Sequence, residues 1–378
     1  MTQINLWQPN DHSIWRVGYD PLSNDNPESK TVEDVVNKHY SGHIFKPIEV
    51  ERLMGKEGGS SINYKVKGKD GPVIHLKNFL RFKCDPDRLN REIETLDRVI
   101  AVADHLVGRG IKTFTFIEAK DGRRYVREGD SQWMASIFIE GDHYKGTLPQ
   151  LQQFAKELGR IDKSMQSFQN AIDSEYVEIP FKPEILRELK DLNKKAMSEN
   201  PSEMDHLAQT VINEILEPML QGIVEGVKRY SFEPGITVGN IHPHHTLYEG
   251  DDLKAVSDPE KASFGYPVIE QISFSAHRFI RQAIVYMFTC HGVEPNKEEI
   301  KRLMDGFIKG YIKENNLSAK EIEAIPLMIA KTNAHKALRI LQYHYGLEID
   351  TMGRPVEKLQ SELYKFATHI REAEHFKV

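Results

Sequence analysis

The sequence has 378 residues and a composition typical of soluble globular proteins, with 39% hydrophobic and 28% charged residues. Its formal net charge of −6 argues against a nucleic-acid-binding protein, and no run of about 18 apolar residues predicts a membrane span. The two cysteines, Cys84 and Cys290, suit a reducing compartment, so we expect a cytoplasmic protein without a disulfide framework.

Residues 1–30 are rich in Asn, Asp, Pro and Ser, which predicts irregular structure, and we assign 1–47 to an N-terminal extension. Short runs with β-branched residues follow, separated by glycine-rich turns, and one longer segment has apolar residues at helical spacing. These patterns predict a strand-rich small lobe over 48–140. Its expected elements are strands at 48–55, 60–68, 72–80, 112–119 and 132–140, a helix at 85–110, and a turn at Asp121-Gly122.

From Gly141 onwards apolar residues recur every three or four positions, which predicts helices. Turn residues and short extended runs interrupt this pattern in 233–270. The order of elements predicts an α+β protein with two lobes, in which a mostly helical large lobe covers 141–378. The expected helices are 148–168, 182–197, 206–230, 273–292, 297–314 and 319–345.

The stretch VGNIHPHHTL (238–247) lies within this irregular region and contains three histidines. On an extended segment, His242 and His244 would point to the same side and could bind a zinc-type metal ion together with nearby aspartates. One interpretation is therefore a metal-dependent hydrolase that uses His242, His244 and His245. A solvated turn explains the same cluster without any metal.

Three other segments give this stretch a different context. GKEGGSSINYKV (55–66) is a glycine-rich hairpin, VIHLKNF (73–79) places a lysine inside the next strand, and LNREIETLDRV (89–99) places glutamates on the following helix. In this order, with VGNIHPHHTLY behind them, they resemble the aminoglycoside phosphotransferase and choline kinase family. The resemblance covers about 48–345 and implies a bilobal protein-kinase-like fold with ATP and Mg²⁺ between the lobes.

The resemblance assigns the nucleotide site mainly to the small lobe. Backbone N–H groups of the glycine-rich hairpin would cover the phosphates, the strand lysine would hold them, and a helix glutamate would orient the lysine. Backbone groups within WMASIFIEGDHYKG (133–146) would meet the adenine edge. The residues implied are Gly58, Gly59, Ser60, Ser61, Lys77, Glu92 with Glu94 as the alternative, and Ile137 to Ile139.

The family's catalytic loop commonly has the sequence His-Gly-Asp-x-His-Pro-x-Asn, and VGNIHPHH aligns with it without a gap. Gly239, His242 and Pro243 match this pattern. Asn240 stands where the family has its catalytic aspartate, and His245 stands where it has a metal-binding asparagine. The resemblance therefore points to a catalytic loop with a modified active group.

Other positions also differ from the family or match it only in part. Asp258 takes the place of the metal-binding aspartate, 18 residues after Asn240. Asp162 stands where these enzymes often have a histidine on the first helix of the large lobe. Glu270 lies near the place of a later aspartate that braces the catalytic loop.

The change to Asn240 has a definite chemical consequence. An amide can hydrogen-bond to a substrate hydroxyl but cannot accept its proton at neutral pH. Loss of general acid–base help lowers a rate by about 10²–10⁴-fold, whereas positioning and charge stabilisation by a metal ion remain. His245 offers a ring nitrogen to a divalent ion, although Mg²⁺ favours oxygen ligands.

The favoured interpretation is an ATP-dependent phosphotransferase that acts on a hydroxyl of a small molecule, such as an amino sugar, an amino alcohol or a sugar. Asn240, His242 and His245 would form its catalytic loop, and Asp258 with His245 would hold the metal. The second interpretation is a pseudokinase that binds a nucleotide or a partner protein without phosphotransfer. The metal-dependent hydrolase is the third, because it leaves the small-lobe motifs unexplained. We expect no nucleic-acid or membrane partner.

Overall fold

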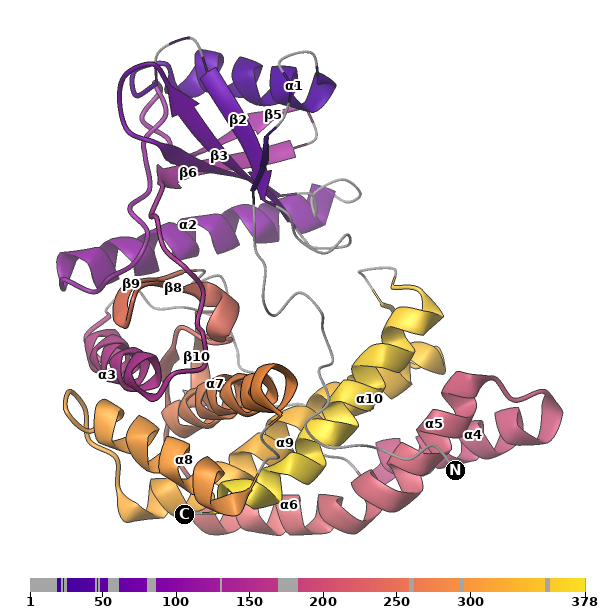
Figure 1. The fold of residues 1–378 in the computed structure, drawn as a ribbon. Helices are drawn as coiled ribbons and strands as arrows, with labels where there is room; N and C mark the ends of the chain where they lie inside the picture. Colours follow the sequence, from indigo (N-terminus) through magenta and orange to yellow (C-terminus); the bar gives the residue numbers. More distant parts are fainter. Residues whose placement is uncertain are drawn as a thin grey trace.

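The computed structural model describes residues 19–21, 23, 26–44, 46, 48–53, 61–79, 86–129, 131–168, 183–257, 262–292, 296–350 and 354–377. They form two lobes, with a β-sheet in the small lobe and mainly helices in the large lobe (Figure 1). This is the bilobal kinase-like α+β fold that the order of elements predicts. Helix α2 (Pro86–Gly108) lies between the sheet and the large lobe (Figure 1).

The small lobe is built on a six-stranded sheet with the order β1-β2-β3-β4-β6-β5, in which all neighbours are antiparallel. In the first half of β2 burial alternates, with Ile48 and Val50 buried and Glu49 exposed, as expected for a strand with one face on a core. Four predicted strands are confirmed as β2, β3, β4 and β6. The bounds are β1 (Tyr19–Pro21), β2 (Ile48–Leu53), β3 (Ser61–Gly68), β4 (Ile74–Phe79), β5 (Tyr125–Glu128) and β6 (Ser131–Ile137).

The predicted strand at 112–119 is wrong. That segment forms a single bridge, between Phe116 and Ser136, because β5 pairs with β6 along most of this edge of the sheet. A turn does form at Asp121-Gly122, but it precedes β5 and does not join two long strands. The hairpin partner of β6 is the short β5, which the sequence pattern missed.

One face of the sheet packs against helix α1 (Pro27–Val35) and the π-helical turn η2 (Val36–Tyr40). The Asn26 side chain begins α1 by accepting the backbone N–H of Glu28 at 2.8 Å. Residues 27–44, which we placed in an N-terminal extension, thus share a hydrophobic core with the sheet. This core includes Val32, Val35, Val36, Tyr40, Ile44, Tyr64, Val66, Leu76 and Trp133.

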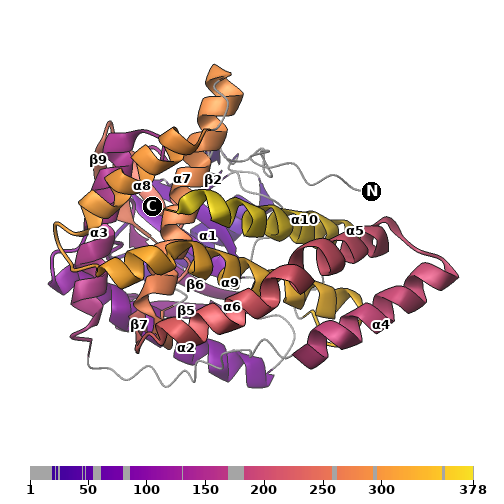
Figure 2. The same ribbon diagram turned by 90° about the horizontal axis from the view of Figure 1, so that it is seen from below.

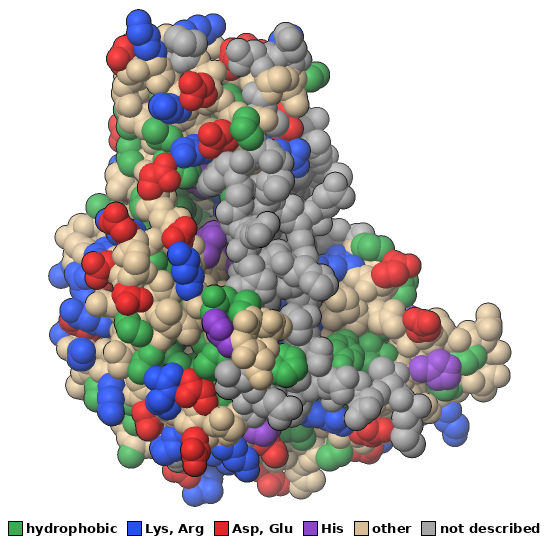
Figure 3. Space-filling model, viewed as in Figure 1, with side chains coloured by type: hydrophobic (Ala, Val, Ile, Leu, Met, Phe, Trp, Pro, Cys, Tyr) green, Lys and Arg blue, Asp and Glu red, His purple; other side chains and the backbone are tan. Residues whose placement is uncertain are grey.

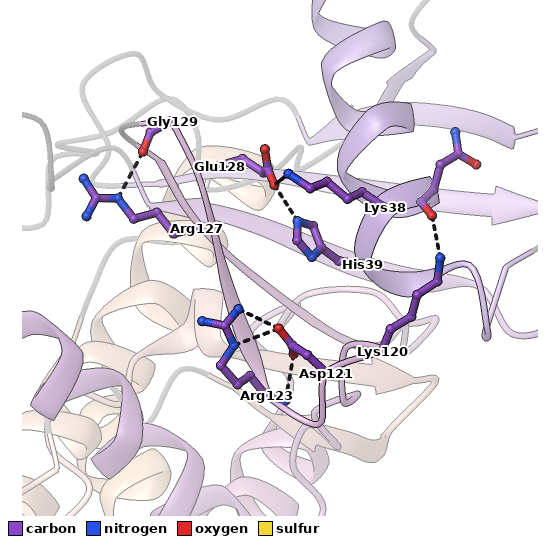
Figure 4. Close-up of polar contacts among 9 residues, drawn as sticks. Lys38, His39, Lys120, Asp121, Arg123, Arg127, Glu128 and Gly129 are labelled. Carbon is purple, nitrogen blue, oxygen red and sulfur yellow. Dashed lines mark hydrogen bonds and ion pairs between the residues drawn. The ribbon is translucent and has the colours of Figure 1, made fainter.

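Polar contacts attach the same helical segment to the β5 edge (Figure 4). Lys38 Nζ and His39 Nε2 lie 2.5 and 2.6 Å from the same oxygen of Glu128 (Figure 4). Lys120 Nζ donates to the backbone carbonyl of Asn37 at 3.0 Å. These contacts connect elements of the small lobe, and none of them reaches the catalytic loop.

The large lobe contains the helices that the 3–4 spacing predicts. Helix α9 is an example of how they begin. The Ser318 hydroxyl and the Glu321 carboxylate form a capping box at its N-terminus. In the part of the chain that the structure describes, we find no helix with the length and hydrophobicity of a membrane span. The bounds are α3 (Leu148–Met165), α4 (Pro183–Glu199), α5 (Glu203–Val211), η4 (Ile212–Leu216), α6 (Glu217–Tyr230), α7 (Val268–His291), α8 (Lys297–Tyr311), α9 (Ala319–His344), α10 (Val356–Glu372) and η6 (Ala373–Phe376).

Helix α7 is the central element of the large lobe. It contacts α3 and α8 on one side and α9 on the other, and α10 packs along α9 (Figures 1 and 2). Phe154 of α3 stacks on Phe279 of α7 with ring centroids 3.7 Å apart, within one continuous apolar core. Helix α7 begins at Val268, five residues before the predicted start at 273, directly after Pro267.

The irregular region predicted at 233–270 is confirmed as a set of short strands above α7. Strand β7 pairs with β10, and β8 pairs with β9, both antiparallel. They lie on the side of the large lobe that faces α2 and the sheet (Figure 1). The bounds are β7 (Pro234–Thr237), the 3₁₀ turn η5 (Pro243–His245), β8 (Thr246–Glu249), β9 (Asp252–Val256) and β10 (Ser263–Pro267).

Candidate active site

The glycine-rich hairpin joins β2 to β3, as predicted. Gly58, Gly59 and Ser60 lie outside the described residues. Ser61 begins β3 and pairs with Phe79, the last residue of β4. The strands on either side of the hairpin are therefore in the order that a phosphate-covering loop requires.

Lys77 lies in β4, where it pairs with Asn63 of β3 and with Met134 of β6. Its Nζ lies 5.0 Å from the ring centroid of Phe79. Side chains of one strand alternate between faces, so Lys77 lies on the face opposite to the buried Leu76.

That face of the sheet packs against α2. Phe79 and Met134 form a small core with Leu96 and Val99 of the helix. The helical repeat brings position 92 to the same side as Leu96 and Val99, four and seven residues further on. The side chains of Glu92 and Glu94 lie outside the described part of the chain, so their pairing with Lys77 stays a prediction.

The segment after β6 was expected to meet adenine. The backbone N–H of Ile137 donates to the Thr115 carbonyl, and that of Phe138 donates to the Val73 carbonyl, both at 3.0 Å. These two N–H groups therefore already form hydrogen bonds within the small lobe. Ile139 follows them on the connection to the large lobe, and its contact with a nucleotide stays a prediction.

The catalytic-loop segment runs from the end of β7 through η5. Gly239 and Asn240 both have left-handed backbone conformations, with φ values of 69° and 47°. Asparagine and aspartate adopt this conformation more readily than other residues with a side chain. The Asn240 side chain is exposed, whereas Ile241 beside it is buried. The loop thus presents Asn240 on its outer side and anchors itself through its neighbours.

Helix α7 holds the underside of this loop. The side-chain oxygen of Gln271 accepts the backbone N–H of Gly239 at 2.5 Å, and the Ser275 hydroxyl donates to the Ile241 carbonyl at 3.0 Å. We expected the bracing residue near Glu270. Gln271 is the residue directly after Glu270, and Glu270 itself is in buried contact with a lysine of α9.

Behind Gln271 lies a fully buried carboxyl group. The amide nitrogen of Gln271 donates to Asp162 of α3 at 2.5 Å, and the Tyr311 hydroxyl lies 2.9 Å from the other Asp162 oxygen. Burial raises the pKa of Asp162 to about 8, although both hydrogen bonds oppose the shift. Asp162 of α3 therefore supports Gln271, the residue of α7 that holds the loop.

The loop histidines lie close together above this brace. The rings of His242 and His245 have centroids 3.7 Å apart, and those of His242 and His244 lie 5.5 Å apart. Burial lowers the pKa of His242 well below its ordinary value, and nearby positive groups lower it further, so the ring is neutral at pH 7. Histidine side chains reach the surface where the two lobes meet (Figure 3).

The arrangement of these histidines gives no support to the interpretation as a metal-dependent hydrolase. Among the described residues, no three histidine, cysteine or acidic side chains converge as ligands of one metal ion. The rings of His242 and His245 instead pack against each other, with 35° between their planes.

The end of β9 approaches the same loop. The backbone N–H and the hydroxyl of Ser257 bond to the His245 carbonyl at 2.7 and 3.2 Å. Asp258, the predicted metal ligand, is the next residue and lies outside the described residues. The backbone N–H of Val256 also donates to the Lys112 carbonyl at 2.8 Å, which connects this strand to the segment after α2.

Some residues of this site were predicted from the sequence, and others were not. Asn240, His242 and His245 share one loop, as predicted. Gln271 was missed because the predicted helix began at 273 and left it in the irregular region. Its spacing of four from Ser275 was the available clue, since polar residues one turn apart share a helix face.

No family model and no curated protein sequence matches this chain. Solved structures do match it. Amicoumacin kinase in complex with AMP-PNP and Ca²⁺ has 15% identity and a TM-score of 0.59, covering 93% of this chain and 95% of that one. Spectinomycin phosphotransferase in complex with ADP and spectinomycin has 11% identity and a TM-score of 0.59, covering 92% and 98%. Ethanolamine kinase from Plasmodium vivax has 14% identity and a TM-score of 0.52, covering 94% and 98%.

These likenesses extend over almost the whole chain. They show that it has the fold shared by the aminoglycoside phosphotransferases and the choline and ethanolamine kinases. The family resemblance that the motifs indicated is thus confirmed as a structural match.

Proposed function

We propose that the protein is an ATP-dependent phosphotransferase that acts on a hydroxyl group of a small molecule. The observation that carries this proposal is the braced loop, in which Gln271, Ser275 and Ser257 each fix part of the backbone around Asn240. Phosphoryl transfer depends chiefly on positioning and charge stabilisation, so a fixed loop is the part it most requires. The fold, shared with ATP-dependent small-molecule kinases, supports the same conclusion.

In this proposal the small lobe binds the nucleotide. Lys77 holds the phosphates and Glu92 orients it, while residues 58–61 cover the phosphates with backbone N–H groups. The backbone near Ile139 meets adenine. The alternation of β4 supports this role for Lys77, because its face of the sheet is the one that packs on α2.

Asp258 with His245 is the proposed metal site. The bonds from Ser257 to the His245 carbonyl support it, because they fix the residue before Asp258 against the loop. A carboxylate oxygen suits Mg²⁺ and an imidazole nitrogen suits it less, so the nucleotide's phosphate oxygens and water would supply most of the remaining ligands. When bound, Mg²⁺ would neutralise charge on the phosphates.

The chemical step follows from the loop. The acceptor oxygen bonds to the γ-phosphorus, the bond from that phosphorus to the β–γ bridging oxygen breaks, and ADP leaves. The Asn240 amide oxygen accepts a hydrogen bond from the hydroxyl and orients it, but it cannot take the proton. His242 is a weak base because its pKa is low, so the proton passes to solvent or to the transferred phosphoryl group. We therefore expect slow turnover.

Calorimetric titration with ATP and Mg²⁺ tests the nucleotide site. We expect binding in the wild type and in Asn240→Asp, with affinity reduced about tenfold or more in Lys77→Ala because a charge-assisted contact is lost. Lys67→Ala is a matched control, because this exposed lysine lies on the neighbouring strand β3. Absence of binding in both the wild type and Asn240→Asp would rule out the nucleotide hypothesis.

The pseudokinase remains the second candidate, and Asn240 is the observation that favours it. A protein that only binds nucleotide would show ATP affinity without release of ADP above the uncatalysed rate. Measured ADP release with a range of hydroxyl acceptors separates the two functions.

A further inference from the structure

A histidine lies near Lys77 on the same face of the small-lobe sheet. Side chains alternate along β4, so His75 and Lys77 lie on one face, while Leu76 between them is buried in the core on the other. The register pairs His75 with Ser136 of β6. It pairs Lys77 with Asn63 of β3. Residues paired across antiparallel strands share a face, so Ser136 and Asn63 lie on this face as well.

Two hydrogen bonds hold the His75 ring between the neighbouring strands. Its Nε2 lies 3.1 Å from the amide oxygen of Asn63, and its Nδ1 lies 3.4 Å from the Ser136 hydroxyl oxygen. An amide oxygen only accepts, so Nε2 donates to Asn63 and Nδ1 accepts from Ser136. The ring also packs against Phe114, with the two centroids 5.5 Å apart. Both ring nitrogens are thus bonded, and the ring has a defined orientation.

The side chain held in this way is still open to a ligand. His75 is partly exposed, although its partner Ser136 is only 1% exposed. Because both nitrogens are bonded, a ligand that reaches His75 would meet a flat aromatic ring and not a spare hydrogen-bonding group. Stacking on such rings is a common way to bind nucleobases, since every base has a π face. The exposed part of His75 therefore suits a flat aromatic ligand.

The proposed nucleotide site places this ring between its two ends. In that site the phosphates lie at Lys77, and the base lies at the segment that begins at Ile137. Ile74 pairs with Ile137, so β4 runs from the base end at Ile74 to the phosphate end at Lys77. Between these two ends, His75 is the residue of β4 whose side chain lies on the Lys77 face, about 7 Å before Lys77 along the strand. A nucleotide that reaches from one end to the other would pass His75.

We infer that the ring of His75 forms a wall of the nucleobase site, and that Asn63 and Ser136 position it there. This inference rests on the proposed function and adds to it a residue that contacts the base. The contact is made by a ring whose nitrogens are already bonded, so it does not distinguish the hydrogen-bonding edges of different bases. Adenine and guanine nucleotides should therefore gain a similar factor in affinity from His75.

Calorimetry on the full chain with Mg²⁺ tests this contact by separating the base from the phosphates. AMP-PNP carries both, whereas inorganic tripolyphosphate carries only a phosphate chain. His75→Ala should weaken AMP-PNP binding about fivefold or more, as the loss of one stacking contact does, and GMP-PNP binding by a similar factor. It should leave tripolyphosphate binding unchanged. Unchanged or tighter AMP-PNP binding in His75→Ala, or an equal loss for tripolyphosphate, would overturn the inference.

Further variants show whether the ring itself makes the contact. His75→Phe keeps an aromatic ring, so it should bind AMP-PNP more tightly than His75→Ala does. His75→Asn removes the ring but keeps polar atoms for Asn63 and Ser136, and it should show the same loss as His75→Ala, which it replaces if that variant does not fold. His43→Ala is the control, because this exposed histidine lies beyond η2 on the α1 side of the sheet, and it should change neither affinity. A loss in His75→Phe as large as that in His75→Ala would contradict an aromatic contact.

The outcomes separate this inference from the proposed function. If the wild type binds neither AMP-PNP nor tripolyphosphate, the proposed function fails and the inference fails with it. If the wild type binds AMP-PNP and the affinity does not depend on His75, the inference alone fails.

Discussion

The two sides of the proposed catalytic loop differ in their contacts and in their exposure. On the underside, Gln271 and Ser275 hold the backbone of Gly239 and Ile241, and Asp162 supports Gln271 from behind. On the outer side, the loop presents Asn240, which lacks the proton acceptor that the family pattern has there. The backbone of the loop is thus held by hydrogen bonds, whereas the proposed reactive group differs from that of the family pattern.

This difference shows why the two kinds of replacement have different consequences. Asp162 departs from the family pattern, but it bonds to Gln271, and Gln271 fixes the loop. The hydrogen bond between these two side chains thus preserves the support of the loop. Among the described residues of the loop, His242 does not supply the proton acceptor that Asn240 lacks, because its pKa is low and it is a weak base.

Removing the brace should have the largest effect on stability. Gln271→Ala leaves the Gly239 N–H and the buried Asp162 carboxyl without this partner, which we expect to lower the free energy of unfolding by about 3 kcal/mol. Urea unfolding followed by circular dichroism measures the change. Gln221→Ala is the matched control, because this exposed glutamine hydrogen-bonds to Glu225 on the same helix α6, and it should cost about 0.5 kcal/mol or less. A loss of similar size in both variants would show that the underside is not specially braced.

The buried carboxyl predicts a pH dependence of stability. The pKa of Asp162 is about 8 in the folded protein and 3.8 as its ordinary value. Between these pH values the folded state keeps a proton that the unfolded state releases, so rising pH destabilises the folded protein. Asp162→Asn has no such proton to lose and still offers an oxygen to Gln271.

We therefore expect Asp162→Asn to gain stability relative to the wild type as pH rises from about 5 to 8, by up to about 1.4 kcal/mol per pH unit, and to level off above that range. Urea unfolding at a series of pH values measures this. The exposed Asp191→Asn is the control and should run parallel to the wild type. A parallel profile for Asp162→Asn as well would place the carboxyl outside the brace.

The second brace should matter less. Ser275→Ala removes one hydrogen bond to the Ile241 carbonyl and leaves the Gln271 contacts in place, so we expect a loss of about 1 kcal/mol. Chemical denaturation measures it, with the exposed Ser198→Ala of α4 as the control. A loss larger than that of Gln271→Ala would reverse the order of the two braces.

The sequence predicted the lobes, most strands and the helices because alternation and 3–4 spacing report directly on burial. It failed at 112–119, where β-branched residues are present but β5 takes the edge of the sheet. It also placed the start of α7 too late, because the polar residues that begin this helix are buried by the loop and resemble a turn.

The site was partly predictable for the same physical reason. Asn240, His242 and His245 follow one another in the chain, so a motif locates them together. The Asp162–Gln271 bond joins residues 109 positions apart, and the pKa of His242 depends on Arg278 and Lys365 from other helices. Local patterns contain no information on such contacts.

The central claim is that an intact frame carries a changed reactive group, and ATP turnover in Asn240→Asp tests it most directly. The left-handed backbone at this position suits aspartate as well as asparagine, so the variant should fold normally. We predict that ADP release in the presence of Mg²⁺ and an acceptor rises by about 10²-fold or more, the low end of general acid–base help. Turnover that stays at the uncatalysed rate in both proteins, while ATP still binds, would contradict the claim and identify a binding protein.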